Sequence, residues 1–198
     1  LELTNEPYAL AKIAGIKLCT SLKKQYGFDA ICLMPTNLYG PGDNYSENNS
    51  HVLPALIRKF HNAKIKNLSK VNCWGSGEPK REFLYVDDLA EASIFAFENI
   101  SSDNKVLYDE NFDYNGTINI GVGKDISIKE LAYLISKIID YRGEIYWDLS
   151  KPDGTPRKLL DTSRINKLGW FAKTNIEEGI KLTLKNYLKE LRRKTIRL

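Results

Sequence analysis

Hydrophobic and polar residues alternate in two different rhythms along this chain. Apolar positions at helical spacing predict helices over residues 6–26, 51–65, 87–100, 127–141 and 162–168, and a last helix that begins at Ile176. Short apolar runs rich in β-branched and aromatic residues predict strands at 29–35, 117–121 and 144–148, and two more within 70–77 and 81–87 around a Gly-rich turn. Strands separated by helices are typical of an α/β fold with a mainly parallel sheet.

The first helix carries its own start and stop signals. Thr4 or Asn5 can serve as its N-cap, and Pro7 fits its first turn. Gly27 supplies a left-handed stop directly after Tyr26. The sequence therefore predicts a long helix that ends at Tyr26.

The segments between the first elements are also predicted from local signals. Residues 29–35 form an apolar run closed by Pro35, which we expect to be a buried parallel strand. Turn-forming residues fill 37–50, and charged, Pro- and Gly-containing sequence fills 150–158, so both are expected to be loops. Ser50 is expected to cap the second helix.

Composition bounds the class of protein. The chain has 198 residues, of which 42% are hydrophobic and 27% are charged, with a net charge of +4. These values are typical of a globular protein that buries a sizeable core, and no apolar run approaches the roughly 20 residues of a membrane span. The basic segment 188–198 is expected to be a solvated helix end and not a nucleic-acid surface. We therefore expect a cytoplasmic protein without nucleic-acid or membrane partners.

The cysteines add a statement about redox state. Cys19, Cys32 and Cys73 show neither a CxxC motif nor metal-ligand spacing, and the sequence predicts no metal site. They are expected to be buried thiols in a reducing compartment.

Tyr8 and Lys12 stand four residues apart on the first helix, so their side chains share one face. A free tyrosine has a pKa of about 10, and a nearby cation favours the phenolate and lowers that value. The pair could then exchange a proton with a substrate oxygen near neutral pH. The alternative is that Tyr8 packs at the edge of a core while Lys12 is solvated.

Longer motifs carry a resemblance that covers essentially the whole chain. The segments NEPYALAK, PTNLYGPGDNY, NSHVLPALIRKF, WGSGEPKREFLYVDDLA and KPDGTPRKLLDTSRINKLGW occur in the order found in one family. They resemble the extended short-chain dehydrogenases/reductases that act on nucleotide sugars, and NSHVLPALIRKF and KPDGTPRKLLD resemble the fucose synthases among them. The resemblance implies the carboxy-terminal part of a Rossmann-type doubly wound sheet plus a small α/β substrate-binding domain.

The resemblance also implies a domain organisation. Residues 1–50 would be the carboxy-terminal part of the NADP-binding Rossmann domain, and 51–198 would be mainly the nucleotide-sugar-binding domain. Residues of about 80–100 would return to the Rossmann sheet. The family's Gly-x-x-Gly-x-x-Gly turn has no counterpart here, since GVGKD at 121–125 comes too late, and the chain begins with Leu1 instead of Met. We therefore expect the carboxy-terminal portion of a longer enzyme, inactive when isolated.

The same resemblance assigns catalytic and cofactor-binding roles. Tyr8 would donate a proton, while Lys12 would hold the nicotinamide ribose of NADP(H) and lower the pKa of the phenol. His51 matches the family's histidine, which protonates a sugar carbon and lies at the cofactor; its alternative role is a polar first-turn residue after Ser50. The candidate cofactor contacts at the strand end are Pro35, Thr36, Asn37 and Leu38. An ordinary strand-ending turn would also explain this last group.

Substrate contacts are implied in the second half of the chain. Arg81 can bind two diphosphate oxygens at once, and Trp74 offers an apolar wall, with plain core packing as its alternative role. Lys59 stands where the fucose synthases have arginine, so it keeps the charge but loses the bidentate geometry. Asp153, Arg157 and Lys158 lie on a loop that closes over the nucleotide in the family, or that is merely solvated here. His61 matches no role and is expected to lie on the surface.

The function implied is NADPH-dependent 3,5-epimerisation and 4-reduction of GDP-4-keto-6-deoxy-D-mannose to GDP-L-fucose. One alternative is an epimerase/reductase for another GDP-deoxy-sugar, such as a heptose; a 4-epimerase with tightly bound NAD fits less well, because it would not need His51. A second alternative is a non-catalytic sugar-nucleotide-binding module. The first helix carries further small and apolar residues that predict a homodimer interface: Ala11, Ala14, Gly15, Leu18 and Leu22.

Overall fold

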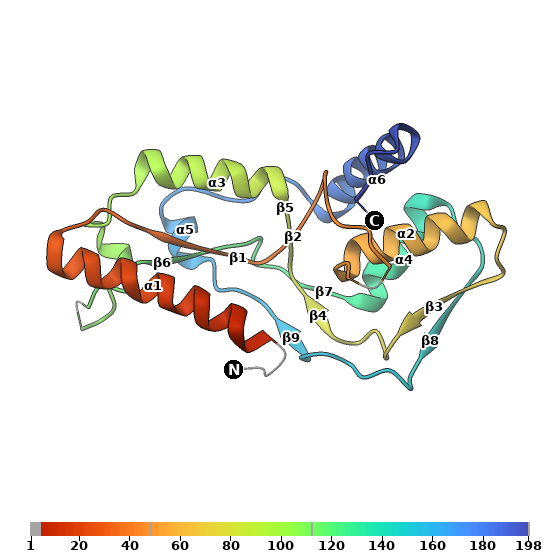
Figure 1. Cartoon of the computed structure of the whole chain (residues 1–198), viewed down its shortest axis with the longest axis horizontal. Helices are drawn as coiled ribbons and strands as arrows, with labels where there is room; N and C mark the ends of the chain where they lie inside the picture. The colour runs from red at the N-terminus through yellow and green to blue at the C-terminus, as the bar shows by residue number, and fades with distance from the viewer. Residues whose placement is uncertain (1–4, 48, 112, 198) are drawn as a thin grey trace.

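The order of helices and strands follows the alternating pattern of the sequence. The computed structural model describes residues 5–47, 49–111 and 113–197 (Figure 1). The helices are α1 (Glu6–Tyr26), α2 (Val52–Ile65), α3 (Val86–Asn99), α4 (Ile128–Ile139), α5 (Ser163–Lys167) and α6 (Ile176–Arg193), with a 3₁₀-helix η2 (Lys105–Leu107). The strands are β1 (Cys32–Pro35), β2 (Asn37–Tyr39), β3 (Lys70–Trp74), β4 (Lys80–Arg81), β5 (Phe83–Tyr85), β6 (Thr117–Ile120), β7 (Ile126–Ser127), β8 (Glu144–Asp148) and β9 (Arg157–Lys158).

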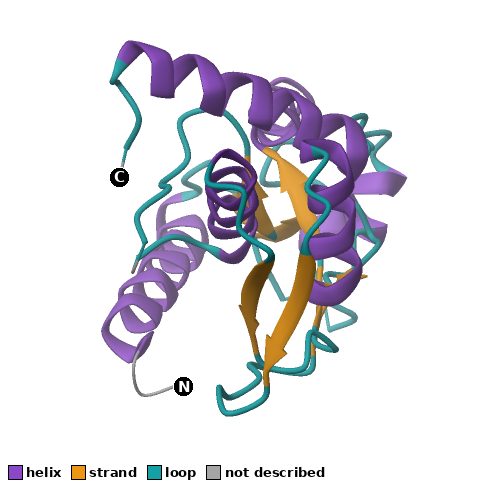
Figure 2. Cartoon of the chain, turned by 90° about the vertical axis from the view of Figure 1, so that its right-hand side faces the viewer, coloured by secondary structure: helices purple, strands orange, loops and turns teal. Residues whose placement is uncertain are grey.

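Most strand pairs are parallel, as predicted. The pairs β1–β6, β2–β5 and β3–β8 are all parallel, and β4 pairs with β9 in parallel and with β7 in antiparallel orientation. The described strands form four small sheets instead of one continuous sheet. Helices lie on both sides of these strands when the molecule is seen from its end (Figure 2). The α/β fold class is confirmed.

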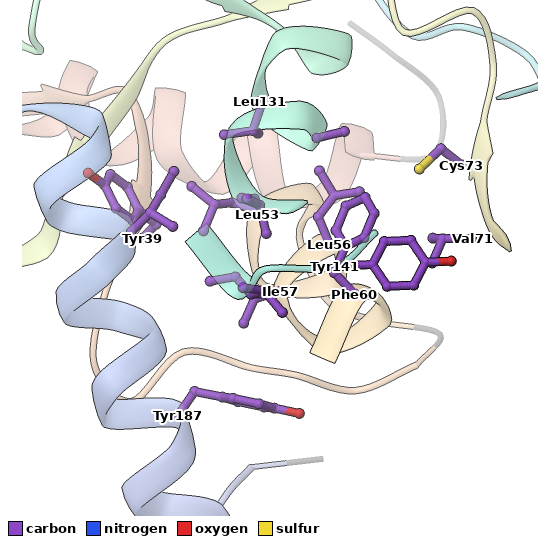
Figure 3. Packing of buried hydrophobic residues seen from close by; sticks show 14 of the residues in the cluster. Tyr39, Leu53, Leu56, Ile57, Phe60, Val71, Cys73, Leu131, Tyr141 and Tyr187 are labelled. Carbon is purple, nitrogen blue, oxygen red and sulfur yellow. The ribbon is translucent and has the colours of Figure 1, made fainter. Parts of the chain in front are cut away.

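Two hydrophobic clusters form the interior, and the β2–β5 pair lies between them. The first cluster gathers residues of α2, β3, α4 and α6, including Leu53, Ile57 and Tyr187 (Figure 3). The second gathers α3, η2, β6 and α5. Successive strand residues face opposite sides, so Phe83 and Tyr85 join the first cluster while Leu84 joins the second. The β2–β5 pair thereby connects the two cores.

Helix boundaries agree well with the local signals. Gly27 has φ 67° and ends α1 as predicted, and Pro7 lies in the first turn. Asn5 occupies the N-cap of α1 without a side-chain hydrogen bond, and Thr4 lies outside the described residues. Ser127 and Glu130 form a complete capping box that fixes the start of α4.

Several expectations about local structure were wrong. The N-cap of α2 is His51 and not Ser50, whose hydroxyl is buried without a hydrogen-bond partner among the described residues. β1 is parallel as expected but is not buried, since β6 is its only neighbour among the described strands and Met34 is 38% exposed. The predicted loops contain the short strands β2 and β9, which exist only through pairing with distant segments.

Two expectations about single side chains also fail. Cys73 is buried, but Cys19 and Cys32 are only partly buried, because they lie between α1 and the weakly covered β1. Burial and the neighbouring Cys19 raise the pKa of the Cys32 thiol to about 11. His61 is not a surface residue: its ring packs edge-on against Tyr187, with Nδ1 3.4 Å from the phenol oxygen.

α1 lies against the rest of the molecule without contributing to either core. None of its residues, all of which are described, is buried, and Leu10, Ile13 and Leu18 are 43–59% exposed. Ion pairs at its last turn hold it, Lys23 with Asp103 and Lys24 with Asp113. Within the described residues, no helix is long and apolar enough to cross a membrane.

Candidate active site

A cavity of about 670 Å³ gathers predicted site residues from four separate segments. Its lining includes Tyr8 of α1, the strand-end residues 35–38, His51 at the start of α2, and Arg81 of β4. These positions lie up to 73 residues apart in sequence, from Tyr8 to Arg81. The parallel strands β1 and β2 bring them together, since the cavity lies where β1 ends and β2 begins.

Tyr8 and Lys12 adopt the arrangement that their spacing predicts. The ammonium nitrogen of Lys12 lies 5.4 Å from the centroid of the Tyr8 ring, on the same face of α1. Tyr8 is 62% exposed, so it does not pack at the edge of a core. Tyr8 lines the cavity, whereas Lys12 is absent from the lining among the described residues. The phenol is thus accessible to a ligand and has a cation beside it.

The strand end at residues 35–38 is bound to Glu82, a buried residue whose role the sequence did not reveal. Asn37 Nδ2 and Thr36 Oγ1 donate to the carbonyl oxygen of Glu82, at 2.8 and 3.3 Å. The Glu82 side chain is fully buried and accepts three backbone N–H groups: Val122 and Gly123 at 2.6 Å and Leu160 at 3.0 Å.

The turn at Gly121 has to come close to that carboxylate. A Cβ atom at Gly121 would lie 2.4 Å from Glu82 Oε1, so the position requires glycine. Through its backbone carbonyl and its carboxylate, Glu82 thereby joins the strand end that carries Thr36 to the turn after β6 and to the segment before α5. Glu82 is a positioning residue that holds the strand-end wall of the cavity against these two neighbouring segments.

His51 and Asp43 enter the cavity from the segment between β2 and α2. His51 has extended backbone angles, is exposed, and makes no side-chain capping bond. Asp43 was not predicted as a site residue. Burial raises the pKa of its carboxyl group, and the positive charges of His51 and Arg197 partly oppose that shift.

Arg81 connects the cavity to the loop at 150–158. One guanidinium nitrogen donates to the carbonyl of Lys80 at 2.7 Å, and the strand register places Arg81 opposite Lys158. A Cβ at Gly154 would lie 3.1 Å from the Arg81 guanidinium, so this loop passes close to it. Arg157 instead forms an ion pair with Asp125, which ties down β9. Arg81 and Lys158, which were each predicted to contact the substrate, therefore lie on adjacent strands.

Trp74 is not a core residue, which removes one of its two predicted roles. Its ring is 66% exposed, and two ammonium groups lie over it. Lys59 Nζ is 5.2 Å and Lys151 Nζ is 5.7 Å from the ring centroid. Lys59 also donates to the carbonyl of Asn72 at 3.2 Å. Lys151 was missed from the sequence, where it was only one of several charges in a loop.

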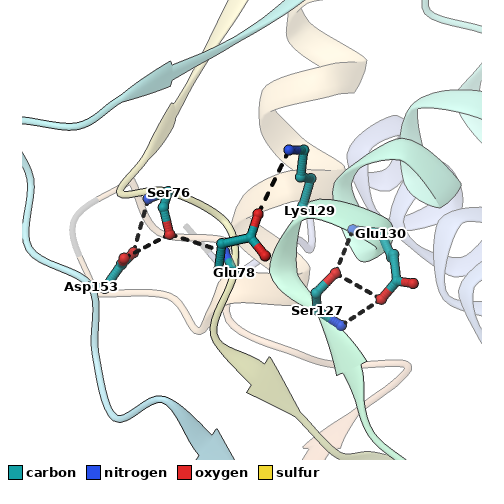
Figure 4. Close-up of polar contacts among 6 residues, drawn as sticks. All are labelled: Ser76, Glu78, Ser127, Lys129, Glu130 and Asp153. Carbon is teal, nitrogen blue, oxygen red and sulfur yellow. Dashed lines mark hydrogen bonds and ion pairs between the residues drawn. The ribbon is translucent and has the colours of Figure 1, made fainter.

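Asp153 holds its loop onto the Gly-rich turn after β3. Its carboxylate accepts the backbone N–H of Ser76 at 2.9 Å and the Ser76 hydroxyl at 2.7 Å (Figure 4). These bonds lower the pKa of the Asp153 carboxyl group. Gly75 has φ 75°, and a Cβ there would lie 2.3 Å from Asp153 Oδ1, so the approach requires glycine. Asp153 is thus engaged with the protein itself.

The predicted site residues form two connected groups. Tyr8, His51, Arg81 and residues 35–38 line one cavity, and Lys12 contacts Tyr8. Outside that lining lie Trp74 of β3, Asp153 and Lys158 of the loop and β9, and Lys59, whose side chain reaches from α2 to Trp74. No group of three or more potential metal-ligating side chains occurs among residues 5–47, 49–111 and 113–197.

Comparison with known proteins defines the class first. Residues 2–121 match the NAD dependent epimerase/dehydratase family, and the chain belongs to that family.

Within the family, the chain is similar to proteins named as GDP-L-fucose synthases. It is 52% identical to the GDP-L-fucose synthase of Escherichia coli (strain K12), over 95% of this chain and 58% of that protein. It is 51% identical to the probable GDP-L-fucose synthase 1 of Oryza sativa subsp. japonica, over 96% of this chain and 55% of that protein. The chain thus spans little more than half the length of these curated relatives.

Solved structures share the fold. A GDP-6-OMe-4-keto-L-xylo-heptose reductase from Campylobacter jejuni superposes with a TM-score of 0.84 at 35% identity, covering 96% of this chain and 62% of that chain. A GDP-L-fucose synthetase from Naegleria fowleri bound to NADP gives a TM-score of 0.71 at 29% identity, covering 85% of this chain and 49% of that chain.

Proposed function

We propose that this chain is the carboxy-terminal region of an NADPH-dependent enzyme that converts GDP-4-keto-6-deoxy-D-mannose to GDP-L-fucose by 3,5-epimerisation and 4-reduction. One observation carries the proposal: a single cavity combines a phenol with a neighbouring ammonium, an exposed imidazole and a guanidinium. The similarity to GDP-L-fucose synthases along 95% of the chain supports it.

The proposed proton transfers follow from the carbonyl chemistry of the sugar. The C4 ketone acidifies the hydrogens at C3 and C5. Inversion of each centre needs a base that removes such a proton, which we assign to the part of the enzyme outside this chain, and an acid that returns a proton to the opposite face. His51 returns that proton, because its imidazole is exposed at the cavity and histidine is the side chain most often used as a general acid. Tyr8 then protonates the C4 oxygen during reduction, and the Lys12 ammonium favours the resulting phenolate.

The residues at this end of the cavity fit the nicotinamide riboside of NADP(H). Lys12 provides three N–H donors for ribose hydroxyls, and the strand-end residues 35–38 offer backbone groups at the cavity wall. NADPH supplies the hydride for C4 when it is bound. Glu82 holds Thr36 and Asn37 through its own carbonyl, which keeps this wall fixed while a ligand binds.

Cationic and aromatic side chains would hold the GDP part of the substrate. Arg81 contributes a guanidinium that can contact two phosphate oxygens, and Lys158 lies opposite it on β9. Trp74 offers an exposed aromatic face with Lys59 beside it. Asp153 would act by holding the loop at 150–158 in place, since Ser76 already occupies its carboxylate.

A GDP-heptose reductase is the second candidate. It is favoured by the superposition on the heptose reductase, which is more extensive than that on the fucose synthetase. Both candidates use the same phenol, ammonium and guanidinium, and they differ in the sugar that the cavity accepts.

The domain division, the assembly and the location complete the proposal. Residues 1–50, with a return at about 80–100, would belong to the cofactor-binding domain, and most of 51–198 would bind the nucleotide sugar. The packing of η2, β6 and α5 with α3 in the second cluster supports an extension of the returning part beyond residue 100. The exposed apolar residues of α1 support a homodimer. We place the enzyme in the cytoplasm, in line with its unpaired cysteines.

The test uses the full-length gene product and two substrates. Incubation with NADPH and GDP-4-keto-6-deoxy-D-mannose should yield GDP-L-fucose, identified by NMR, whereas a 4-keto GDP-heptose should react more slowly. The opposite preference would establish the heptose reductase. If neither substrate led to NADPH oxidation, the remaining interpretation would be a non-catalytic sugar-nucleotide-binding module. The isolated 198-residue chain should turn over far below about 1 s⁻¹, a rate typical of slower enzymes.

A further inference from the structure

Asp43 presents a buried carboxylate oxygen at the wall of the cavity. Its Oδ1 accepts the backbone N–H of Asn44 at 2.7 Å. Its Oδ2 is shielded from solvent and has no hydrogen-bond partner among the described residues. Burying a carboxylate oxygen without a hydrogen-bond donor destabilises the folded protein, because the oxygen loses its hydrogen bonds to water and gains none in exchange. The position therefore calls for a donor from within the site.

Two positively charged groups lie near enough to Asp43 to act on its carboxyl group. His51 and Arg197 both lower the pKa of its carboxyl group, against the larger effect of burial. Burial and, as a smaller cause, the charge of Asp43 raise the pKa of the neighbouring Tyr45 phenol. The main chain of Tyr45 is already bound, because its N–H donates to the carbonyl of Arg197 at 2.9 Å. Of these groups, His51 shares the cavity with Asp43.

The location of His51 gives a second reason for a negative partner. His51 is the N-cap of α2, where the helix dipole is positive and disfavours a charged imidazolium. No acidic residue lies in the first turn of α2 to offset this. A carboxylate from the preceding segment can do so instead.

We propose that Asp43 is a positioning residue for His51: when the imidazole turns toward Asp43, the unpartnered carboxylate oxygen accepts its N–H and sets the orientation of the ring in the cavity. The proposal rests on the proposed role of His51 as the proton donor for the sugar carbons. It goes further by assigning the group that supplies the imidazolium with its counter-charge. The competing explanation is that Asp43 only stabilises the turn at Asn44.

NMR titration of the imidazole rings tests the pair directly. The described chain holds two histidines, His51 and His61, so the His51→Gln variant assigns both signals. In Asp43→Asn the midpoint of the His51 titration should fall by about 0.3 pH unit or more, as expected for a partly solvated ion pair. Glu47→Gln is the matched control, because Glu47 lies in the same segment but pairs with Arg58, 3.6 Å away. It should leave the midpoint unchanged.

A reciprocal measurement covers the case in which Asp43→Asn does not fold. The carboxyl carbon of Asp43 should titrate at higher pH in His51→Gln than in the unmodified protein, since the opposing positive charge is gone. No movement of either midpoint would overturn the pairing. Both readouts are independent of turnover, so the two hypotheses are tested separately. The titrations report whether Asp43 pairs with His51, and the sugar products report whether His51 acts as an acid.

Discussion

Ser76 and Asp153 join two loops that lie 77 residues apart in sequence, through a backbone and a hydroxyl hydrogen bond to one carboxylate. The turn after β3, which follows Trp74, and the loop that runs past Arg81 are thereby held against each other (Figure 4). The cohesion of this part of the site depends on the charge of one exposed side chain.

That contact makes the loop at 150–158 sensitive to acid. The folded pKa of Asp153 lies below the ordinary carboxyl value, so its hydrogen bonds stabilise the loop above that value and are lost as pH falls through the folded pKa. The Ser76 amide resonance should therefore shift, and proteolytic cleavage of the loop should increase, below about pH 4. Ser76→Ala removes one of the two bonds, and its transition should lie at higher pH; an identical transition would show that Asp153 does not hold the loop.

Tyr8→Phe removes only the phenolic hydroxyl, which we propose as the proton donor. In the full-length gene product, NADPH oxidation should fall by about 10²- to 10⁴-fold, the usual contribution of a general acid. Binding of the GDP-sugar, measured by calorimetry, should stay within about twofold, because the ring and its neighbour Lys12 remain. Tyr26→Phe is the matched control on the same helix, 70% exposed and outside the cavity, and should be silent.

His51→Gln separates the two chemical steps. Epimerisation should slow while reduction continues, so reduced but non-inverted sugar should accumulate and be detected by NMR of the products. His61→Gln offers a control histidine on the opposite end of α2, packed on Tyr187, and should leave the product ratio unchanged. Equal loss of both steps in His51→Gln would mean that the residue serves α2 as a cap and not the sugar as an acid.

Glu82 should be among the most sensitive positions for stability. In Glu82→Gln the amide cannot accept all three backbone N–H groups, so at least one buried donor is left unpaired, which costs about 1–3 kcal/mol of unfolding free energy. Glu82→Ala should cost more, because all three donors lose their partner. Glu98→Gln, at an exposed position of α3, should change stability by less than about 0.5 kcal/mol. Chemical denaturation measures the three variants, and equal stability of all of them would contradict this role.

Assembly is tested on the exposed side of α1. The full-length gene product should be a homodimer by light scattering, and Ile13→Glu should shift it toward monomer by placing a charge among apolar residues. Phe97→Glu on α3, where the side chain is 90% exposed, is the control and should leave the dimer intact. A monomeric unmodified protein at tens of micromolar would exclude the interface.

Local signals predicted the long elements, and contacts between distant residues decided what the sequence did not reveal. α1, α4 and α6 carry periodic apolar faces and stop signals such as Gly27, which act within the element itself. β2 and β9 are two or three residues long and exist through pairing with β5 and β4, so no local pattern could reveal them.

The same difference explains the site. The resemblance to the family indicated the residues that line the cavity, Tyr8 and His51 among them. Glu82 was missed because its role is to accept three backbone N–H groups, and these come from segments about 40 and 78 residues away in sequence. Asp43 lies in the segment predicted as a polar loop, although an acidic residue beside a Gly-Pro-Gly turn, eight positions before a candidate histidine, is a usable signal.

The way α1 is attached has a mechanical consequence. Its ion pairs with the rest of the molecule lie in the last turn, at Lys23 and Lys24, whereas Tyr8 lies near the other end. At 1.5 Å per residue, about 22 Å of helix separates Tyr8 from Lys23. If α1 tilts by about 3° around its last turn, the Tyr8 phenol moves by about 1 Å. A displacement of this size can lower a reaction rate about 100-fold. A contact on the exposed side of α1 would therefore change the position of the Tyr8 phenol. A second subunit bound there would in this way change the reaction rate.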